Sequence, residues 1–389
     1  MEPGVPGSDT PGADTPRSGV PGPARGIDAE IAEKRRRLRA YLDAEGLPGV
    51  YLKRQDNVAW ITGGHLNHVG LATEMGGAGL LFTPSACYLV ANCIEAPRLL
   101  QEEELEAQGF EALVYPWDRD READLIREVV GDGKLAADCP LEGARALGSD
   151  FRALRYRLTP AETDRYRELG FRSAEALAGV ARTVLPGETE AQVAGRLSDA
   201  LWAHRIDCAG IFVGADERIS RFRHPIVTET PIERRAMITV NARKWGLIVS
   251  FTRFVRFGPL EPELRRRYQA AVEIDCAMMA ATRPGRPAVE VLRRGLAAYA
   301  DRGFSEEPKL HHQGGAIGYL PREYKVTPDS TESVGEDQAF AWNPSITGVK
   351  SEDTILATTD GPEILTPAVD YPSLNVEGVD FPRSDILIL

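Results

Sequence analysis

One order of predicted elements occurs twice between residues 158 and 389: two helices, followed by strand-rich sequence. Apolar spacing and Pro and Gly breaks predict helices at 160–185, 188–202, 262–282 and 287–302. Strands are predicted at 211–213, 237–240 and 247–255 after the first pair, and at 339–342 and 354–357 after the second. The recurrence indicates an α+β domain with an internal pseudo-repeat.

The start of this domain is marked by Thr159-Pro160-Ala161-Glu162. Thr159 suits a helix cap and Pro160 suits the first helical position. Glu162 stands where its side chain can accept a hydrogen bond from the backbone N–H of the cap residue. We therefore expect a new helix, and with it a new domain, to begin at about residue 158.

Residues 27–157 alternate between helical and strand patterns and predict a separate α/β domain. The expected helices lie near 28–45, 97–108 and 119–130, and the expected strands at 49–53, 58–62, 79–83, 87–91, 111–117 and 134–138. Residues 1–26 contain six Pro and six Gly and almost no large apolar side chain. Such a segment cannot offset its ordering entropy by burial, so we expect a disordered tail.

The sequence pattern predicts which charged side chains face solvent and which aromatic side chains lie in the core. The basic run at 34–39 belongs to a helix whose apolar stripe is Ile31, Leu38, Tyr41 and Leu42. Its charges are expected on a solvated face, with a patch for a partner as the alternative. The tryptophans expected in the core are Trp60, Trp117, Trp202 and Trp245.

The overall charge excludes some classes of function. A formal charge of -12 and a pI near 5.2 argue against nucleic acid and anionic membranes as partners, because both require excess Lys and Arg. The chain has no secretory signal pattern and no apolar run of about 18 residues, so a cytoplasmic protein is expected. Its five cysteines show no metal-binding spacing, which favours free thiols.

Four segments together resemble the aminopeptidase P, prolidase and creatinase superfamily. These are 57–63 (NVAWITG), 185–190 (LPGETE), 246–253 (GLIVSFTR) and 348–354 (GVKSEDT). The resemblance spans about residues 30–389. It implies a C-terminal pita-bread domain preceded by a creatinase-type N-terminal domain, and a homodimer.

The peptidases of this superfamily hold two divalent ions with two Asp, one His and two Glu. On this chain the resemblance places the two Asp positions at Thr239 and Ser250, the His position at Gly315 and one Glu position at Asn343. Only Glu352 keeps its ligand type. Two dications need several anionic donors, so we expect neither a dinuclear site nor another cofactor. A weak mononuclear site, with His311 or His312 beside Glu352, is a minor alternative.

The remaining candidates for chemistry also come from the resemblance. His224 is the expected acid or base, and Glu352 is the expected second catalytic group. Arg322, Glu323 and His311 are expected to bind the substrate, with Arg322 anchoring a carboxylate. His65 and His68 lie in a loop that, in creatinase-like dimers, reaches the partner's cleft. Each of these side chains has a structural alternative, such as a loop hydrogen bond or an ion pair.

Three functions are compatible with this pattern. The leading hypothesis is a metal-independent, creatinase-type hydrolase or lyase acting on a carbon–nitrogen bond of a small carboxylated substrate. The second is a catalytically silent pseudo-peptidase that binds a peptide or protein in the old cleft. The third is a metal-dependent Xaa-Pro aminopeptidase or dipeptidase. The sequence does not identify the substrate.

Overall fold

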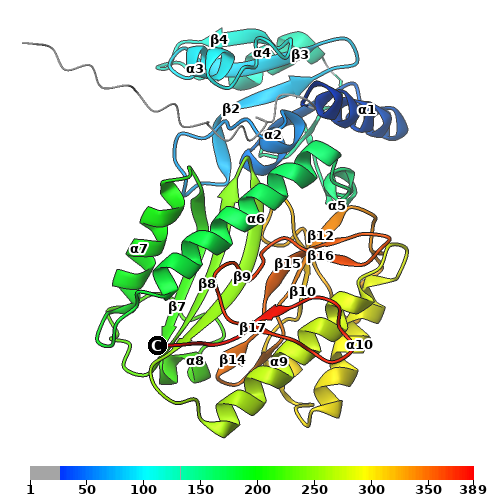
Figure 1. The fold of residues 1–389 in the computed structure, drawn as a ribbon. Coiled ribbons are helices and arrows are strands. Elements are labelled where there is room, and N and C mark those ends of the chain that lie inside the picture. Colours follow the sequence, from blue (N-terminus) through cyan, green and yellow to red (C-terminus); the bar gives the residue numbers. More distant parts are fainter. Residues whose placement is uncertain (1–26, 132) are drawn as a thin grey trace, which may run out of the picture.

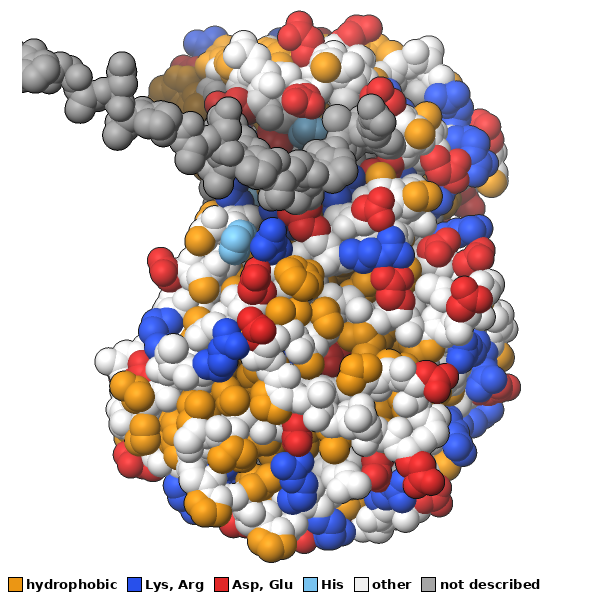
Figure 2. All heavy atoms as spheres, in the orientation of Figure 1, with side chains coloured by type: hydrophobic (Ala, Val, Ile, Leu, Met, Phe, Trp, Pro, Cys, Tyr) orange, Lys and Arg blue, Asp and Glu red, His pale blue; other side chains and the backbone are white. Residues whose placement is uncertain are grey.

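The computed structural model describes residues 27–131 and 133–389. The tail expected at residues 1–26 lies outside the described residues. Figure 1 shows a smaller N-terminal domain set against one end of a larger body, in which long helices flank the sheets. On the face shown in Figure 2, Lys and Arg side chains are interspersed with Asp and Glu. No helix among the described residues is both long and apolar enough to cross a membrane, and all five cysteines are free.

The N-terminal domain is built on a six-stranded mixed sheet of order β4-β3-β2-β1-β5-β6. Its strands are β1 (Val50–Arg54), β2 (Met75–Phe82), β3 (Cys87–Asn92), β4 (Glu111–Tyr115), β5 (Ala136–Ala137) and β6 (Arg145–Ala146). Its helices are α1 (Ile27–Glu45), α2 (Gln55–Ile61), α3 (Ala96–Gln101), α4 (Glu122–Val130) and α5 (Ser149–Arg152), followed by the 3-10 turn η1 (Ala153–Arg155). The α/β prediction for this part of the chain is therefore confirmed.

One element type was predicted wrongly in this domain. The strand expected at 58–62 is part of helix α2, and all seven residues of that helix are buried. A short helix enclosed on every side has the same continuous apolar run as a buried strand, so periodicity alone could not separate the two.

The first half of the larger domain contains α6 (Pro160–Ala181), α7 (Glu190–Trp202) and α8 (Glu217–Arg221). Thr159 and Glu162 form the predicted capping box at the start of α6. Its sheet has the order β19-β9-β8-β7, with β7 (Asp207–Ala215), β8 (Arg235–Lys244) and β9 (Leu247–Arg256). The C-terminal strand β19 (Leu387–Ile388) returns to pair in parallel with β9.

The second half repeats this plan with α9 (Pro262–Ala281), α10 (Ala288–Asp301) and the turn η2 (Glu307–Leu310). Its main sheet has the order β11-β10-β12-β15-β16. The strands are β10 (Gly314–Ala316), β11 (Tyr324–Lys325), β12 (Gln338–Trp342), β15 (Asp353–Ala357) and β16 (Pro362–Ile364). Two small hairpins complete it: β13 (Ser345–Ile346) with β14 (Val349–Lys350), and β17 (Ser373–Leu374) with β18 (Arg383–Ser384). The predicted pseudo-repeat is confirmed.

The two halves meet where β9 runs beside the segment that leads into β15. Thr252 N donates to Glu352 O at 3.0 Å, and Ser250 N donates to Thr354 Oγ1 at 2.8 Å. Side chains alternate along a strand, so Val240, Val249 and Phe251 point toward the helices while Thr239, Ser250 and Thr252 share the opposite face. The polar face of the β8–β9 hairpin is therefore brought against the second half of the domain.

Side-chain burial differs from expectation at several residues. Trp60 is buried, whereas Trp117 is 69% exposed and Trp202 is 49% exposed. Lys34, expected on a solvated face, is 0% exposed. Its ammonium lies 2.5 Å from Glu30 and 2.8 Å from Glu162, so the cost of burying its charge is offset by two carboxylates.

Candidate functional site

Hydroxyl groups stand at Thr239 and Ser250, where the resemblance to the peptidases placed two aspartates. In the β8–β9 register Thr239 lies opposite Thr252, and Asn241 lies opposite Ser250. The Oγ1 atoms of Thr239 and Thr252 are 2.8 Å apart, and Ser250 Oγ donates to Asn241 Oδ1 at 2.6 Å. These neutral groups satisfy one another, so this side of the cleft supplies no anionic metal ligand.

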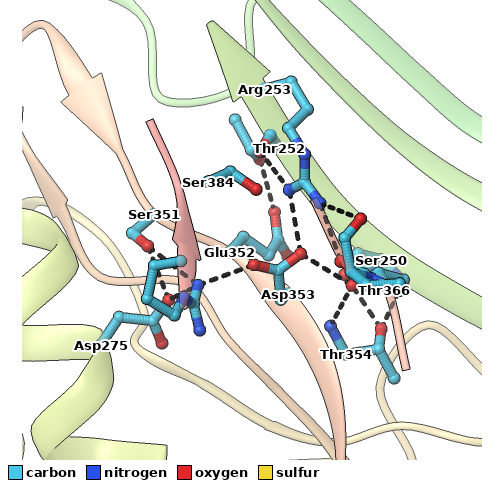
Figure 3. Close-up of polar contacts among 12 residues, drawn as sticks. Ser250, Thr252, Arg253, Asp275, Ser351, Glu352, Asp353, Thr354, Thr366 and Ser384 are labelled. Carbon is cyan, nitrogen blue, oxygen red and sulfur yellow. Dashed lines mark hydrogen bonds and ion pairs between the residues drawn. The ribbon is translucent and has the colours of Figure 1, made fainter. Parts of the chain in front are cut away.

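Glu352, the one position to which the resemblance assigns an unchanged ligand type, is held by two cations. Lys350 Nζ lies 2.7 Å from its Oε2, and Arg322 Nη2 lies 3.2 Å from its Oε1. Thr252 Oγ1 also donates to Oε2 at 3.0 Å, a contact visible in Figure 3. Burial alone would raise the pKa of Glu352, but Lys350 and Arg322 outweigh it and lower the pKa to about 2. The carboxylate is therefore ionised and already neutralised from within the protein.

The backbone at Gly315 leaves no room for a side chain. A Cβ atom added there would lie 2.2 Å from Tyr324 O and 3.0 Å from Lys325 Cα, far inside normal contact distances. The position of a ligand histidine is thus closed by the backbone of β11 as well as being occupied by glycine.

Asn343, the fourth substituted position, is 2% exposed at the end of β12. Its backbone N–H donates to Gln313 O at 3.2 Å, whereas its buried Oδ1 has no hydrogen-bond partner in the protein. An unsatisfied buried amide is costly, so this oxygen is a point at which the cleft can accept a hydrogen bond from a ligand.

Three imidazoles converge in the same cleft. His224 follows α8, and His311 and His312 follow the turn η2. His224 Nε2 and His311 Nε2 are 3.2 Å apart, and His311 Nδ1 lies 3.4 Å from Ser345 Oγ. The rings of His311 and His312 are 4.5 Å apart between centroids, and His312 Nδ1 accepts from Gly314 N at 3.2 Å.

All three imidazoles are kept neutral near pH 7. Burial and then the charge of Lys350 lower the pKa of His311 to about 2. Burial and then Arg322 lower the pKa of His312 to about 4. The pKa of His224 is also lowered, by burial and by Lys350, although His224 is the most exposed of the three. A neutral imidazole keeps a lone pair that can accept a proton or bind a metal.

Arg322 and Glu323 are adjacent in sequence but have different surroundings. Arg322 Nη1 donates to Pro321 O at 2.6 Å and Nη2 faces Glu352, while its buried Nε has no partner. Glu323 is fully engaged inside the protein, because Oε2 accepts from Arg155 and Oε1 accepts from Tyr319 N at 2.9 Å. Arg322 therefore faces the cleft, whereas Glu323 holds the loop that carries it.

The two N-terminal histidines do not belong to the group of three imidazoles. His65 Nδ1 is 3.6 Å from Glu103 Oε2. Burial and the charge of Arg243 lower the pKa of His68. A role for either residue in a neighbouring chain's cleft stays a prediction.

A cavity of about 460 Å³ lies between the N-terminal domain and the larger domain. Arg243 and Ile248 line it, one register step beyond Asn241 and Ser250 on the same face of the hairpin. Pro321, next to Arg322, lines it as well. The N-terminal domain contributes Arg54, Asp56, Leu66 and Leu71, among others. Both domains therefore contribute to the walls of this cavity.

A buried network of opposite charges supports the segment that carries Glu352. Asp353 accepts from Arg253 at 2.9 Å (Figure 3). It also lies 2.8 Å from Arg383. Arg383 also pairs with Asp275 at 2.7 Å. Burial raises the pKa of Asp275 to about 7 despite this contact. Ser351 Oγ donates to Asp275 at 2.7 Å, so these ties hold the residues on both sides of Glu352.

Sequence reasoning missed Lys350, whose ammonium decides the electrostatics of the cleft. A signal was present, because Lys350 and Glu352 are two residues apart in an extended segment and such residues point to the same side. Thr252 and Ser345 were missed as well. Their contacts depend on register and on loop packing, which spacing in the sequence does not reveal.

The residues present do not fit two divalent cations. Of the five positions, Thr239, Ser250 and Asn343 are neutral, Gly315 has no side chain, and the carboxylate of Glu352 is shared by Lys350 and Arg322. Hard dications need anionic oxygen ligands that this set does not provide.

Comparison with known proteins places this site in context. The model of "Metallopeptidase family M24" matches residues 164–359. An uncharacterized peptidase of Staphylococcus aureus (strain MW2) is 26% identical over 121 residues, 30% of this chain and 34% of the relative. The match thus spans about a third of the length of such curated relatives.

Solved structures share the fold over almost their whole length. An Xaa-Pro dipeptidase from Bacillus anthracis has a TM-score of 0.73 at 18% identity, covering 92% of this chain and 100% of that one. A recombinant prolidase from Thermococcus sibiricus has a TM-score of 0.74 at 16% identity, covering 93% and 99%. The N-terminal domain of FACT complex subunit SPT16 from Cicer arietinum has a TM-score of 0.67 at 11% identity, covering 87% and 97%. At these identities the likeness establishes a pita-bread fold with an N-terminal domain.

Proposed function

Since the chain belongs to metallopeptidase family M24, we propose that it is a member which works without the dinuclear metal centre. The proposed activity is that of a hydrolase or lyase acting on a carbon–nitrogen bond of a small carboxylated substrate. Both the metal independence and the reaction are proposed for this chain alone and not for the relatives described above.

The observation that carries the proposal is the 2.7 Å contact between Lys350 Nζ and Glu352 Oε2. Both side chains are nearly inaccessible, at 4% and 3% exposed. A dication bound to the same oxygens would have to displace the ammonium or lie beside it with little water to screen the repulsion. Lys350 therefore supports a cleft that holds its own positive charge in place of metal ions.

Positive charge in this cleft favours an anionic substrate group. Lys350 and Arg322 carry two positive charges and Glu352 carries one negative charge, so the three together have a net charge of +1. Arg322 also retains an Nε–H without a hydrogen-bond partner. A guanidinium presents donors in a fork that matches a carboxylate. We therefore assign the substrate carboxylate to Arg322, with Glu352 holding both cations in place.

His224 is the proposed acid and base. It is the most exposed of the three imidazoles and neutral near pH 7, so it can accept a proton from an attacking water. In hydrolysis the water oxygen forms a bond to the carbon, the carbon–nitrogen bond breaks, and the proton returns to the leaving nitrogen. His311, 3.2 Å away, orients the ring of His224, and the amide of Asn343 is available to the reacting end.

The test combines a metal assay with a substrate screen. Untagged protein, purified without chelator, is assayed for bound metal and then incubated with pooled carboxylated amides, amidines and short peptides, with turnover followed by mass spectrometry. We expect turnover that chelator leaves intact and that His224→Ala abolishes. His204→Ala, a change at an exposed histidine, is the matched control. Two ions per chain together with chelator-sensitive cleavage before proline would overturn the proposal in favour of a metal-dependent Xaa-Pro peptidase.

A catalytically silent binder is the second candidate. The observation in its favour is the set of neutral groups at Thr239, Ser250, Gly315 and Asn343, because it removes the machinery of the metallopeptidases without supplying a new nucleophile. In that case His224→Ala changes the affinity for a bound peptide or protein, and no pool member is turned over.

A further inference from the structure

We propose that His224, His311 and His312 form a binding site for one transition-metal ion that imidazole ligands favour, such as Zn²⁺, Ni²⁺ or Cu²⁺. We further infer that occupation of this site inhibits the chemistry proposed above. The second statement rests on the proposed function, whereas metal binding does not.

The spacing of the three rings carries the proposal. Each residue offers a ring nitrogen, and these nitrogens all lie within 4.8 Å of one another. His224 Nε2 and His311 Nε2 are 3.2 Å apart, close to the spacing of about 3.3 Å between two ligands at Zn–N bonds of about 2.0–2.1 Å in a tetrahedron. Within residues 27–131 and 133–389 no other three His, Cys, Asp or Glu side chains come this close.

The surroundings of His311 suit a metal ligand. Its Nδ1 lies 3.4 Å from Ser345 Oγ, so the ring can donate there while Nε2 keeps its lone pair for a metal. A hydrogen bond from the second ring nitrogen usually fixes the orientation of a metal-binding imidazole. Neutral imidazoles also suit Zn, Ni and Cu better than Mg or Ca, which prefer oxygen.

This site differs from the family's dinuclear centre in its residues. None of the three imidazoles stands at Thr239, Ser250, Gly315, Asn343 or Glu352. It also differs from a site built on a histidine and Glu352, because Lys350 and Arg322 already hold that carboxylate. The structure assigns the third ligand to His224, which the turn after α8 brings against His311.

Two features set the strength of binding. The net positive charge of Lys350, Arg322 and Glu352 lies nearby and opposes a cation. In addition, His312 Nδ1 accepts a hydrogen bond from Gly314 N. Metal binding by Nδ1 uses the accepting lone pair, and metal binding by Nε2 moves the ring proton to Nδ1, so either mode loses this hydrogen bond. We therefore expect binding weak enough for chelators to strip the ion readily, and stronger when the charge of Lys350 is removed.

Inhibition follows from the choice of ligands. A metal bound to Nε2 of His224 uses the lone pair that would accept the proton of the attacking water. Zinc is then an inhibitor of this enzyme, and a chelator restores activity to zinc-treated protein.

The test is direct titration of metal-stripped, untagged, full-length protein. Isothermal titration calorimetry with ZnCl₂ is expected to give one ion per chain, and CoCl₂ is expected to give the intense visible absorption of a four-coordinate Co²⁺ ion. His312→Ala and His311→Ala should each weaken Zn²⁺ binding by at least roughly 10–100-fold, the loss seen when even an outer-shell partner is removed. His204→Ala should bind as the parent does, and thermal unfolding of each variant checks that it is folded.

Three results would overturn the metal site. The first is no heat and no absorption at a metal concentration of about 100 µM. The others are an equal loss of binding in His204→Ala, and unchanged binding in His312→Ala and His311→Ala. The two proposals fail in different ways. Absence of binding leaves the proposed function standing, whereas two ions per chain that are lost in Glu352→Gln would remove both. Zinc that binds at the three histidines without slowing turnover would refute the inhibition alone.

Discussion

Arg155 donates two hydrogen bonds to Glu323 Oε2, at 3.1 Å from Nε and 2.8 Å from Nη2. Its Nη1 lies 2.9 Å from Asp56 Oδ2 in the N-terminal domain, to which Arg155 itself belongs. The side chains of Arg155 and Glu323 are only 1% and 2% exposed. One guanidinium thus ties the loop that carries Arg322 to helix α2.

Arg155→Ala should destabilise the protein by about 3–5 kcal/mol, because it leaves Asp56 and Glu323 buried without their cation. Urea unfolding at pH 7 measures this loss. Arg157→Ala, which removes a mostly exposed arginine paired with Glu336, should leave the midpoint unchanged. Equal midpoints for the two variants would contradict the buried network.

Lys34→Ala should be similarly costly, at about 3–5 kcal/mol, because Glu30 and Glu162 would share a buried site with less positive charge. Arg165 still pairs with Glu30 in this variant, so the loss of the ammonium affects Glu162 more than Glu30. Arg36→Ala on the same helix removes only a solvent-exposed pair with Glu33 and serves as the control. Thermal unfolding compares the two, and a Lys34→Ala midpoint equal to that of Arg36→Ala would show that the ammonium is not buried.

Lys350→Met should destabilise the protein at pH 7 by about 3–5 kcal/mol, since Glu352 would lose its closest cation. In the parent protein the folded pKa of Glu352 is about 2, against an ordinary value of 4.5. Its ionised form therefore contributes stability above about pH 4.5 that is lost as the pH falls toward 2. In Lys350→Met the folded pKa rises, so the deficit relative to the parent should shrink between pH 7 and pH 4.

Urea unfolding at the two pH values measures this change, and a second substitution provides the control. The double variant Lys350→Met/Glu352→Gln is compared with Glu352→Gln alone. Neither protein carries the carboxylate, so the difference in stability between them should be independent of pH over the same range. A deficit in Lys350→Met that stays constant from pH 7 to pH 4 would argue against the Lys350–Glu352 pair.

Gly315→Ala should cost about 3 kcal/mol or more, because the new Cβ would meet Tyr324 O at 2.2 Å. Gly179→Ala is the control, since Gly179 lies in α6 with open space around it and alanine there should stabilise by about 0.5–1 kcal/mol. Calorimetry separates the two outcomes. A Gly315→Ala protein as stable as the parent would mean that β11 can move aside, and that a histidine at 315 is sterically possible.

Much of the fold follows from the sequence because its helices and strands are long and periodic. The capping box at Thr159, helices α6 and α9 and strand β9 all have local signals that do not depend on distant residues. Helix α2 lacked such a signal, because it is short and wholly buried.

The candidate site was less predictable because its contacts join distant parts of the chain. Substitutions at Thr239 and Ser250 are readable one residue at a time, whereas the contact of Arg322 with Glu352 depends on how two distant segments pack. Outside the site, the burial of Lys34 depends in the same way on Glu162, which a different domain supplies. Trp117 and Trp202 are exposed for the same kind of reason: whether an aromatic ring finds cover depends on which element packs over it, and local apolar content does not determine that.

The buried ion pairs of Lys34 and those of Arg155 form two networks that also determine how the chain unfolds. Lys34 and Arg155 reach across the domain boundary, and through Tyr319 and Glu323 both networks end on one loop. Separating the domains would break these buried ion pairs and expose the apolar core that both domains share, so neither domain has a low-energy route to open alone. The described chain should therefore melt as a single cooperative unit. A chimera that exchanges one domain for a homologue's must import the matching ionic partners or it will not fold.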